Sequence, residues 1–388
     1  MTSTEREFTS VEICAGAGGQ ASGLHEAKFR HLALIEIDKH ACATLNLNIK
    51  GNAEWDGCQV IEADLISLKP RSLRLDLGLK AGDLDLLAGG VPCPPFSVAG
   101  KQLGEDDERD LFPIMLNLVE ELRPKAVMIE NVRGLLDQKF QGYRERILGD
   151  LKLMGYEKCY WKVLEAKDYG VPQLRPRAIL VAMKEEYAQY FLWGEPEKRP
   201  IVTVGKALKK SMKARFDAID DPCADAAYKK WLKEASKGVA PTLVGGSKKH
   251  GGADLGPTRA KKAWSDLGVC GLGVANAPSE MKSPERDLFA DAGPKLTVMQ
   301  AAIIQGFSPK WKFAGLKTAA YRQVGNAFPP PVAKAVGEQI YAALKAAKAA
   351  KAAAAPADID GLFELPDPSA TGADASDRIG NLESAGVR

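Results

Sequence analysis

A cysteine lies in a proline-rich segment that follows an apolar run of the chain. The segment is Gly89-Gly90-Val91-Pro92-Cys93-Pro94-Pro95-Phe96-Ser97. Because proline fixes φ and removes a backbone donor, the prolines on both sides hold the Cys93 thiol in one presentation. A thiol held in this way can act as a nucleophile. The alternative is an inert thiol in a tight turn, since free cysteine is among the most buried residue types.

A carboxylate and two arginines flank other apolar runs. Glu130 comes directly after the run at residues 126–129, and Arg175 and Arg177 precede the run at residues 178–183. A carboxyl group in such a place can act as a general acid, and guanidinium groups suit recognition of an oxygen on a planar ring or a phosphate. The alternatives are a helix cap for Glu130 and surface salt bridges for the arginines.

A glycine turn separates the first expected strand from the first expected helix. It is Gly16-Ala17-Gly18-Gly19, and Glu36 follows about twenty residues later, at the end of the second expected strand. Such a turn lets backbone N–H groups approach a nucleoside cofactor, and the acid can bind its ribose. The pattern does not distinguish NAD from S-adenosylmethionine as the cofactor. A tight turn that only packs against its neighbours is an equally good interpretation. Asp64, after a third strand, could bond an adenine amino group or cap a helix.

These residues are positioned by short apolar runs that alternate with helical patterns. We expect helices at residues 22–28, 39–48 and 332–350, and strands at residues 8–13, 32–35, 59–63, 84–88, 126–129, 160–164 and 178–183. The alternation predicts an α/β fold with a Rossmann-like, doubly wound and mostly parallel sheet. Open sheets of this kind bind ligands at the carboxyl ends of their strands. Cys93, Glu130 and the glycine turn would therefore meet at one edge.

Charge is spread unevenly over the 388 residues, although the net charge is only +3. Residues 229–262 hold nine Lys or Arg against two acids, with Trp231 and Trp264 interleaved, whereas residues 356–388 hold seven acids against two arginines. The basic stretch suits nucleic acid, and its alternative is a solvated lysine-rich surface. The acidic tail has few apolar residues and is expected to be disordered.

The cysteines and the hydropathy indicate the compartment. Seven scattered cysteines without a CxxC pair argue against a disulfide framework and against a metal site. The chain starts without an apolar leader, and no window approaches 18 uninterrupted apolar residues. We therefore expect a cytoplasmic protein that is neither secreted nor spans a membrane.

Taken in order, these signals resemble one known pattern, that of the bacterial modification-type DNA cytosine-5 methyltransferases. The resemblance runs over most of residues 8–345. Its motifs are Cys14-Ala15-Gly16-Ala17-Gly18-Gly19, Pro92-Cys93-Pro94-Pro95-Phe96-Ser97 with Gly100-Lys101-Gln102, Glu130-Asn131-Val132, Gln173-x-Arg175-x-Arg177, and Tyr321-Arg322-Gln323-Val324-Gly325-Asn326-Ala327.

The resemblance implies a fold of the S-adenosylmethionine-dependent methyltransferases and a covalent mechanism. It implies that the Cys93 thiolate adds to C6 of a cytosine flipped out of double-stranded DNA, so that C5 can take the methyl group. Glu130 would bond N3 and the exocyclic amine, and Arg177, with Arg175, would hold O2.

The resemblance also implies the residues that bind the cofactor S-adenosylmethionine and the DNA. For the cofactor they are Cys14, Ala15, Gly16, Gly18, Gly19, Glu36, Ile37, Asp64 and Asn326. For the DNA they are Ser97, Lys101, Gln102 and Arg109, in a loop at residues 98–112 expected to close over the flipped base, and Lys248, Lys249 and His250. Cys14 and Ile37 stand where aromatic side chains are usual in the family, which affects the expected cofactor affinity.

The expected organisation has four parts. They are a catalytic and cofactor-binding domain at residues 1–188, a target-recognition domain at 189–290, a segment returning to the first domain at 291–350, and the acidic tail at 351–388. We expect a monomer, with a separate cognate restriction endonuclease as a candidate partner. Two alternative functions are an RNA cytosine-5 methyltransferase of the tRNA type and a catalytically silent DNA-binding module. The large basic segment favours duplex DNA, because groove readout needs a dedicated domain.

Overall fold

The computed structural model describes residues 7–92, 110–196, 200–245 and 253–354. Contacts between Cα atoms gather the described residues up to Lys348 into one compact unit. Cys93, Ser97, Lys101, Gln102, Arg109 and the stretch from Lys248 to His250 lie outside the described residues. The four-part division stays a prediction, except that residues 351–354 are helical, so the expected tail cannot begin at residue 351.

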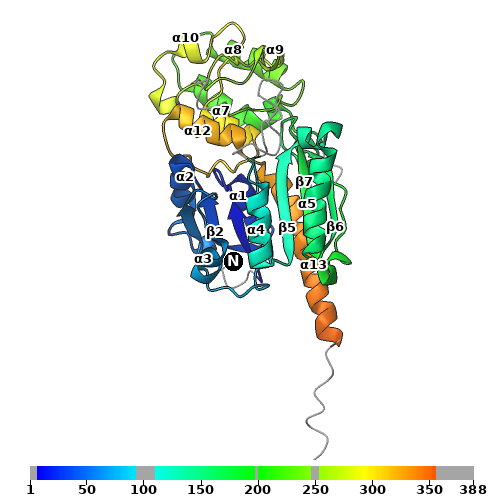
Figure 1. Ribbon diagram of the computed structural model, residues 1–388. Coiled ribbons are helices and arrows are strands. Elements are labelled where there is room, and N and C mark those ends of the chain that lie inside the picture. The colour runs from blue at the N-terminus through cyan, green and yellow to red at the C-terminus, as the bar shows by residue number, and fades with distance from the viewer. Residues whose placement is uncertain (1–6, 93–109, 197–199, 246–252, 355–388) are drawn as a thin grey trace, which may run out of the picture. The chain divides into compact units, whose positions relative to one another are not determined.

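Seven strands of the described chain form one sheet. They are β1 (Phe8–Ile13), β2 (Phe29–Glu36), β3 (Gln59–Glu62), β4 (Leu86–Gly89), β5 (Ala126–Val132), β6 (Tyr156–Glu165) and β7 (Pro176–Lys184). Their order is β3-β2-β1-β4-β5-β7-β6 (Figure 1). The strands from β3 to β5 run parallel, and β7 is antiparallel to both of its neighbours. The prediction of a mostly parallel sheet is confirmed.

Helices connect and cover these strands. They are α1 (Gly19–Glu26), α2 (Lys39–Ile49), α3 (Pro70–Asp76), α4 (Phe112–Leu122), α5 (Gln141–Leu153), α6 (Glu185–Ala188), α7 (Val204–Asp217), α8 (Ala224–Ala235), α9 (Thr258–Asp266), α10 (Pro284–Asp287), α11 (Val298–Ile304), α12 (Lys317–Asn326) and α13 (Pro330–Ala354). Helix α1 begins earlier than the expected residue 22, because Gly18, at φ 83°, already ends the preceding turn.

The two faces of the sheet carry separate apolar cores. On β4, Leu86 and Ala88 pack in one core with residues of α1 and α13, while Leu87 packs in the other with residues of α4 and α5. Successive side chains of a strand point to opposite faces, so a fully apolar strand such as β4 is buried on both. Because both faces of the sheet are packed, the ends of its strands are held in place, and the candidate site lies at these ends.

Helices α7 to α10 lie beyond the ends of the strands (Figure 1). Their apolar residues share one core with Ala15, Leu34 and Leu45 of the sheet region and with Val324 of α12. Trp231 and Trp264, which the charge pattern had placed in a nucleic-acid-binding surface, are 2% and 0% exposed. That expectation is wrong for both side chains, because they form the core of this helical region.

Replacing either of two helical glycines with alanine is expected to change the stability of the protein, in opposite directions for the two positions. A Cβ on Gly23 of α1 would lie 2.3 Å from the Pro330 carbonyl oxygen and 2.6 Å from the Ala333 Cβ, whereas a Cβ on Gly149 of α5 would meet nothing within 4 Å. We expect Gly23→Ala to lower the free energy of unfolding by about 2 kcal/mol. Gly149→Ala should raise it by about 0.5–1 kcal/mol. Urea unfolding of both variants checks this, and equal effects would contradict the close packing of α1 on α13.

Candidate active site

The glycine turn binds the carboxylate of Glu36. The Gly16 N–H donates to Glu36 Oε2 at 2.7 Å, and the N–H groups of Ile37 and Asp38 donate to Oε1 at 2.9 and 2.8 Å. Gly16 and Gly18 have φ values of 53° and 83°, and Cys14 also has a positive φ of 50°. The turn and the end of β2 are therefore joined through the Glu36 carboxylate.

A cavity of about 360 Å³ opens at the carboxyl ends of β1 to β5. It is lined by residues that the sequence nominated, namely Cys14, Ala15, Gly16, Gly19, Glu36, Ile37, Asp64, Asn326 and Glu130. Gly18 is not among the lining residues, and a Cβ there would lie 2.8 Å from both Leu45 and Trp311, so its role is packing. Asp64 lines the cavity and also accepts the Ile66 N–H at 3.0 Å, in a turn rather than at a helix start, since the next helix begins at Pro70 with Lys69 as its N-cap.

The lining of the cavity is strongly acidic. Among the described lining residues one cation, Arg322, stands against five carboxylates, those of Glu12, Glu36, Asp38, Asp64 and Glu130. Burial, with Glu36 and Glu12 nearby, raises the pKa of the Cys14 thiol to about 12, so this thiol stays neutral. A lining of this charge favours a ligand that carries positive charge.

Five polar lining residues were not nominated from the sequence: Glu12, Gln20, Asp38, Arg322 and Gln323. One signal could have found Glu12, because it is a charged residue inside the apolar run of β1 and is 1% exposed. An acid on a strand that is buried on both faces needs a partner or a ligand.

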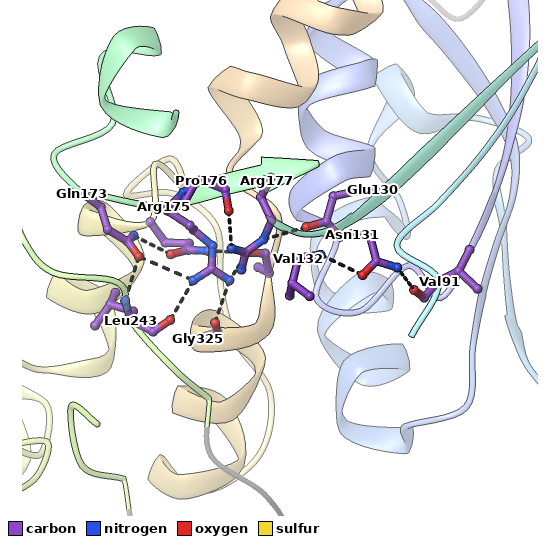
Figure 2. A network of polar contacts seen from close by, with 12 residues as sticks. Val91, Glu130, Asn131, Val132, Gln173, Arg175, Pro176, Arg177, Leu243 and Gly325 are labelled. Carbon is purple, nitrogen blue, oxygen red and sulfur yellow. Dashed lines mark hydrogen bonds and ion pairs between the residues drawn. The ribbon is translucent and has the colours of Figure 1, made fainter. Parts of the chain in front are cut away.

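Glu130 and Arg177 form an ion pair across β5 and β7 (Figure 2). Arg177 Nε lies 2.7 Å from Glu130 Oε1, and the two side chains are 13% and 14% exposed. Arg177 pairs with Val132 in the antiparallel register, so Glu130, two residues along, is its diagonal neighbour. The contact falls outside hydrogen-bond geometry and is an electrostatic one.

Glu130 also lies beside the segment that leads to Cys93. A Cβ on Gly90 would be 3.1 Å from Glu130 Oε2, and Asn131 Nδ2 donates to the Val91 carbonyl at 2.8 Å (Figure 2). Pro92, the residue directly before Cys93, lines the same cavity as Glu130. The backbone that carries Cys93 is therefore tied to the end of β5.

Arg175 does not share the position of Arg177. Its side chain is 1% exposed, Nη1 donates to the Leu243 carbonyl at 2.7 Å, and Nη2 donates to the carbonyls of Gly325 and Ala327, each at 2.9 Å (Figure 2). Neither arginine is among the residues that line the cavity, but Arg177 contacts Glu130, which does line it. The expectation that both guanidinium groups face the ligand is wrong for Arg175, because its donors are used by the backbone of two distant segments.

Comparison with known proteins decides the family. The family model described as C-5 cytosine-specific DNA methylase matches residues 8–342. The chain belongs to this family. This methylase is therefore a DNA cytosine-5 methyltransferase, and its cofactor is S-adenosylmethionine.

Curated relatives and solved structures agree with this. The methylase is 50% identical to Type II methyltransferase M.NaeI of Lentzea aerocolonigenes, over 86% of this chain and 75% of that protein. It is 48% identical to Type II methyltransferase M.NgoMIV of Neisseria gonorrhoeae, over 87% of this chain and 99% of that one. A Spodoptera frugiperda DNMT2 mutant shares its fold with a TM-score of 0.56 at 15% identity, over 86% of this chain and 100% of that one.

Among the residues that the structure describes, no helix is long and apolar enough to cross a membrane. No group of three or more His, Cys, Asp or Glu side chains in the same part of the chain is placed to hold a metal ion.

Proposed function

We propose that this methylase modifies a cytosine flipped out of a specific double-stranded DNA sequence, with Cys93 as the nucleophile. The observation that supports it is that Glu130, the glycine turn and Pro92 line one cavity. A base inside a duplex cannot reach such a cavity, so it must leave the stack, at a cost of about a few kcal/mol.

Each residue of the proposed site has one task. The Cys93 thiolate forms a bond to C6, which gives C5 the electron density to take the methyl group. Glu130 contacts N3 and the exocyclic amine of the ring. Arg177 holds Glu130 in place, and we assign it to O2. Loss of the C5 proton then expels Cys93 as the thiolate and leaves 5-methylcytosine. Arg175 has no direct part in this proposal, because it is bonded elsewhere.

The acidic cavity fits S-adenosylmethionine, which supplies an electrophilic methyl group on a positively charged sulfur. Five carboxylates against one cation complement that charge. We assign Glu36 to the ribose hydroxyls and Asp64 to the adenine amino group. Ile37 and Asn326 would form other parts of the wall that surrounds the cofactor. Glu36 already accepts three backbone N–H groups, so it is held ready for the ribose.

Glu36 gives a prediction for cofactor affinity. We expect Glu36→Gln to weaken binding of S-adenosylhomocysteine by about ten- to hundredfold, because the amide loses the charge and turns an N–H₂ toward backbone donors. The control is Glu62→Gln, since Glu62 pairs with Glu36 across the strand ends, is exposed and does not line the cavity. Calorimetric titration measures both, and equal affinities would remove Glu36 from the cofactor site.

We assign DNA contacts to the expected closing loop, with Ser97, Lys101, Gln102 and Arg109, and to Lys248, Lys249 and His250. The basic stretch at residues 229–262 supports a polyanionic partner. Because both curated relatives described above are named Type II methyltransferases, we further propose a restriction-modification role with a separate endonuclease. We also propose that the methylase acts as a monomer in the cytoplasm.

The experiment that tests the proposal is bisulfite sequencing of DNA from cells that express the chain. Protected cytosines within one short sequence are the expected result, and protection without sequence preference would contradict specific recognition. Transfer of tritium from labelled cofactor to duplex DNA, compared with tRNA, separates the proposal from RNA methylation. A denaturation-resistant adduct with DNA containing 5-fluorocytosine would exclude a catalytically silent module.

A further inference from the structure

The one cation of the described cavity lining has no function in the scheme above. Arg322 lies on α12, is half-buried, and its Nε is buried without a hydrogen-bond partner. No carboxylate of the described chain forms an ion pair with it, although five line the same cavity. An unpaired buried polar group is costly, so a guanidinium left free in this place calls for an anionic ligand.

The part of α12 that carries Arg322 joins the cavity to the segment at residues 240–245. A Cβ on Gly245 would lie 2.5 Å from the Arg322 carbonyl oxygen and 2.3 Å from Asn326 Oδ1. Asn326, one turn further along α12, lines the cavity together with Arg322. Helix α12 lies between the strand ends and helices α7 to α10 (Figure 1). Arg322 is therefore placed where the cavity meets the region expected to recognise DNA.

The charge of the lining creates a conflict that Arg322 can resolve. Five carboxylates suit the positive sulfur of the cofactor, but they repel a polyanion. A cytosine that leaves the duplex to reach Glu130 brings its sugar and the flanking phosphates toward the same cavity. A guanidinium can hold two oxygens of one phosphate at once, so Arg322 is suited to offset this repulsion.

We propose that Arg322 binds a phosphate that flanks the flipped cytosine, so that a cavity suited to a cationic cofactor also admits the backbone of DNA. The inference rests on the proposed function, because a base that stays in the duplex would leave these phosphates outside. It adds a DNA contact from α12, on the wall of the cofactor cavity, to the contacts assigned to the closing loop and the basic stretch.

The first test is the salt dependence of DNA binding. Fluorescence anisotropy is measured with a labelled duplex that carries the sequence found by bisulfite sequencing. We expect Arg322→Met to lower the slope of log K against log salt by about one, and to lower the affinity about tenfold, because one phosphate contact is lost. Arg322→Lys should keep the slope and recover part of the affinity, since it keeps the charge without the two-pronged geometry. This rescue separates loss of charge from damage to the fold.

The matched control is Lys345→Met. Lys345 is an exposed cation on α13 that does not line the cavity. Tyr341, one turn earlier, packs against Phe8 at the start of β1, with ring centroids 4.9 Å apart. Lys345 therefore lies toward the opposite edge of the sheet, and its loss should change neither the slope nor the affinity. An unchanged slope in Arg322→Met would overturn the proposal.

The second test replaces single phosphates. Duplexes carry one methylphosphonate linkage, which has no charge, on one or the other side of the target cytosine. At one of these positions the wild type should lose about tenfold in affinity, whereas Arg322→Met should lose less than about twofold, because its contact is already absent. Losses that simply add at both positions would overturn the proposal.

The carboxylate of the cofactor is the other anion that Arg322 could meet. Calorimetric titration without DNA compares S-adenosylhomocysteine with 5′-methylthioadenosine, which lacks that carboxylate. We expect Arg322→Met to bind both within about twofold of the wild type. A selective loss of S-adenosylhomocysteine would overturn the proposal in favour of the cofactor. In each of these failures the wild type still methylates DNA, whereas a wild type without preference for its own duplex would contradict the proposed function itself.

Discussion

Replacing Cys93 with alanine is expected to reduce methyl transfer to background while the protein stays folded and binds cofactor. Without the sulfur no bond to C6 can form, and C5 of an unmodified cytosine is too poor a nucleophile to take the methyl group. Val91, two residues before Cys93, is held by Asn131, whose Nδ2 donates to the Val91 carbonyl at 2.8 Å. The measurement is tritium transfer from labelled cofactor to duplex DNA, together with calorimetric titration of S-adenosylhomocysteine.

The matched control for this prediction is Cys223→Ala. Cys223 is an exposed thiol that precedes α8 and does not line the cavity, so its loss should leave the rate unchanged. Turnover by Cys93→Ala above background would refute the nucleophile assignment. Loss of cofactor binding in that variant would show instead that the thiol supports the fold.

The second large effect is expected on stability, from Arg175→Met. This substitution leaves the buried carbonyls of Leu243 and Gly325 without the donor that the structure gives them. Bonds from a charged donor contribute about 1.5–3 kcal/mol each, so we expect the free energy of unfolding to fall by about 3–5 kcal/mol. Urea unfolding followed by circular dichroism measures the change.

The position of Arg175 predicts a functional consequence as well. Leu243 leads toward the basic stretch at residues 248–250, and Gly325 directly precedes Asn326 in the lining of the cavity. The two segments are in close contact, since a Cβ on Gly325 would lie 2.4 Å from the Gly245 nitrogen. Affinities for DNA and for S-adenosylhomocysteine should therefore fall together in Arg175→Met. Arg175→Lys should recover only part of either, because one ammonium cannot serve carbonyls on both segments. Unchanged stability and affinity would contradict this anchoring role.

The sequence by itself determined the strands, the mostly parallel sheet and nine of the residues that line the cavity. Parallel strands end at one edge, so residues that follow β1, β2, β3 and β5 must converge wherever the turns are short. Gly16 and Glu36, nominated by their spacing of about twenty residues, follow or end two such strands and line the cavity. The same is true of Asp64 and Glu130, which lie at the edge where the pattern predicted them.

Only the tertiary structure decided the positions of Arg175 and Arg322. Both arginines of the pair Arg175 and Arg177 come just before the apolar run at residues 178–183, which favoured one shared edge of the sheet for their side chains. However, β7 begins at Pro176, so Arg175 precedes the strand and turns toward Leu243 and Gly325, 68 and 150 residues away. Such partners depend on how distant segments pack, and no local pattern encodes them. Arg322 likewise became visible as a cation without a partner in the described chain only when the structure placed it in the acidic lining of the cavity.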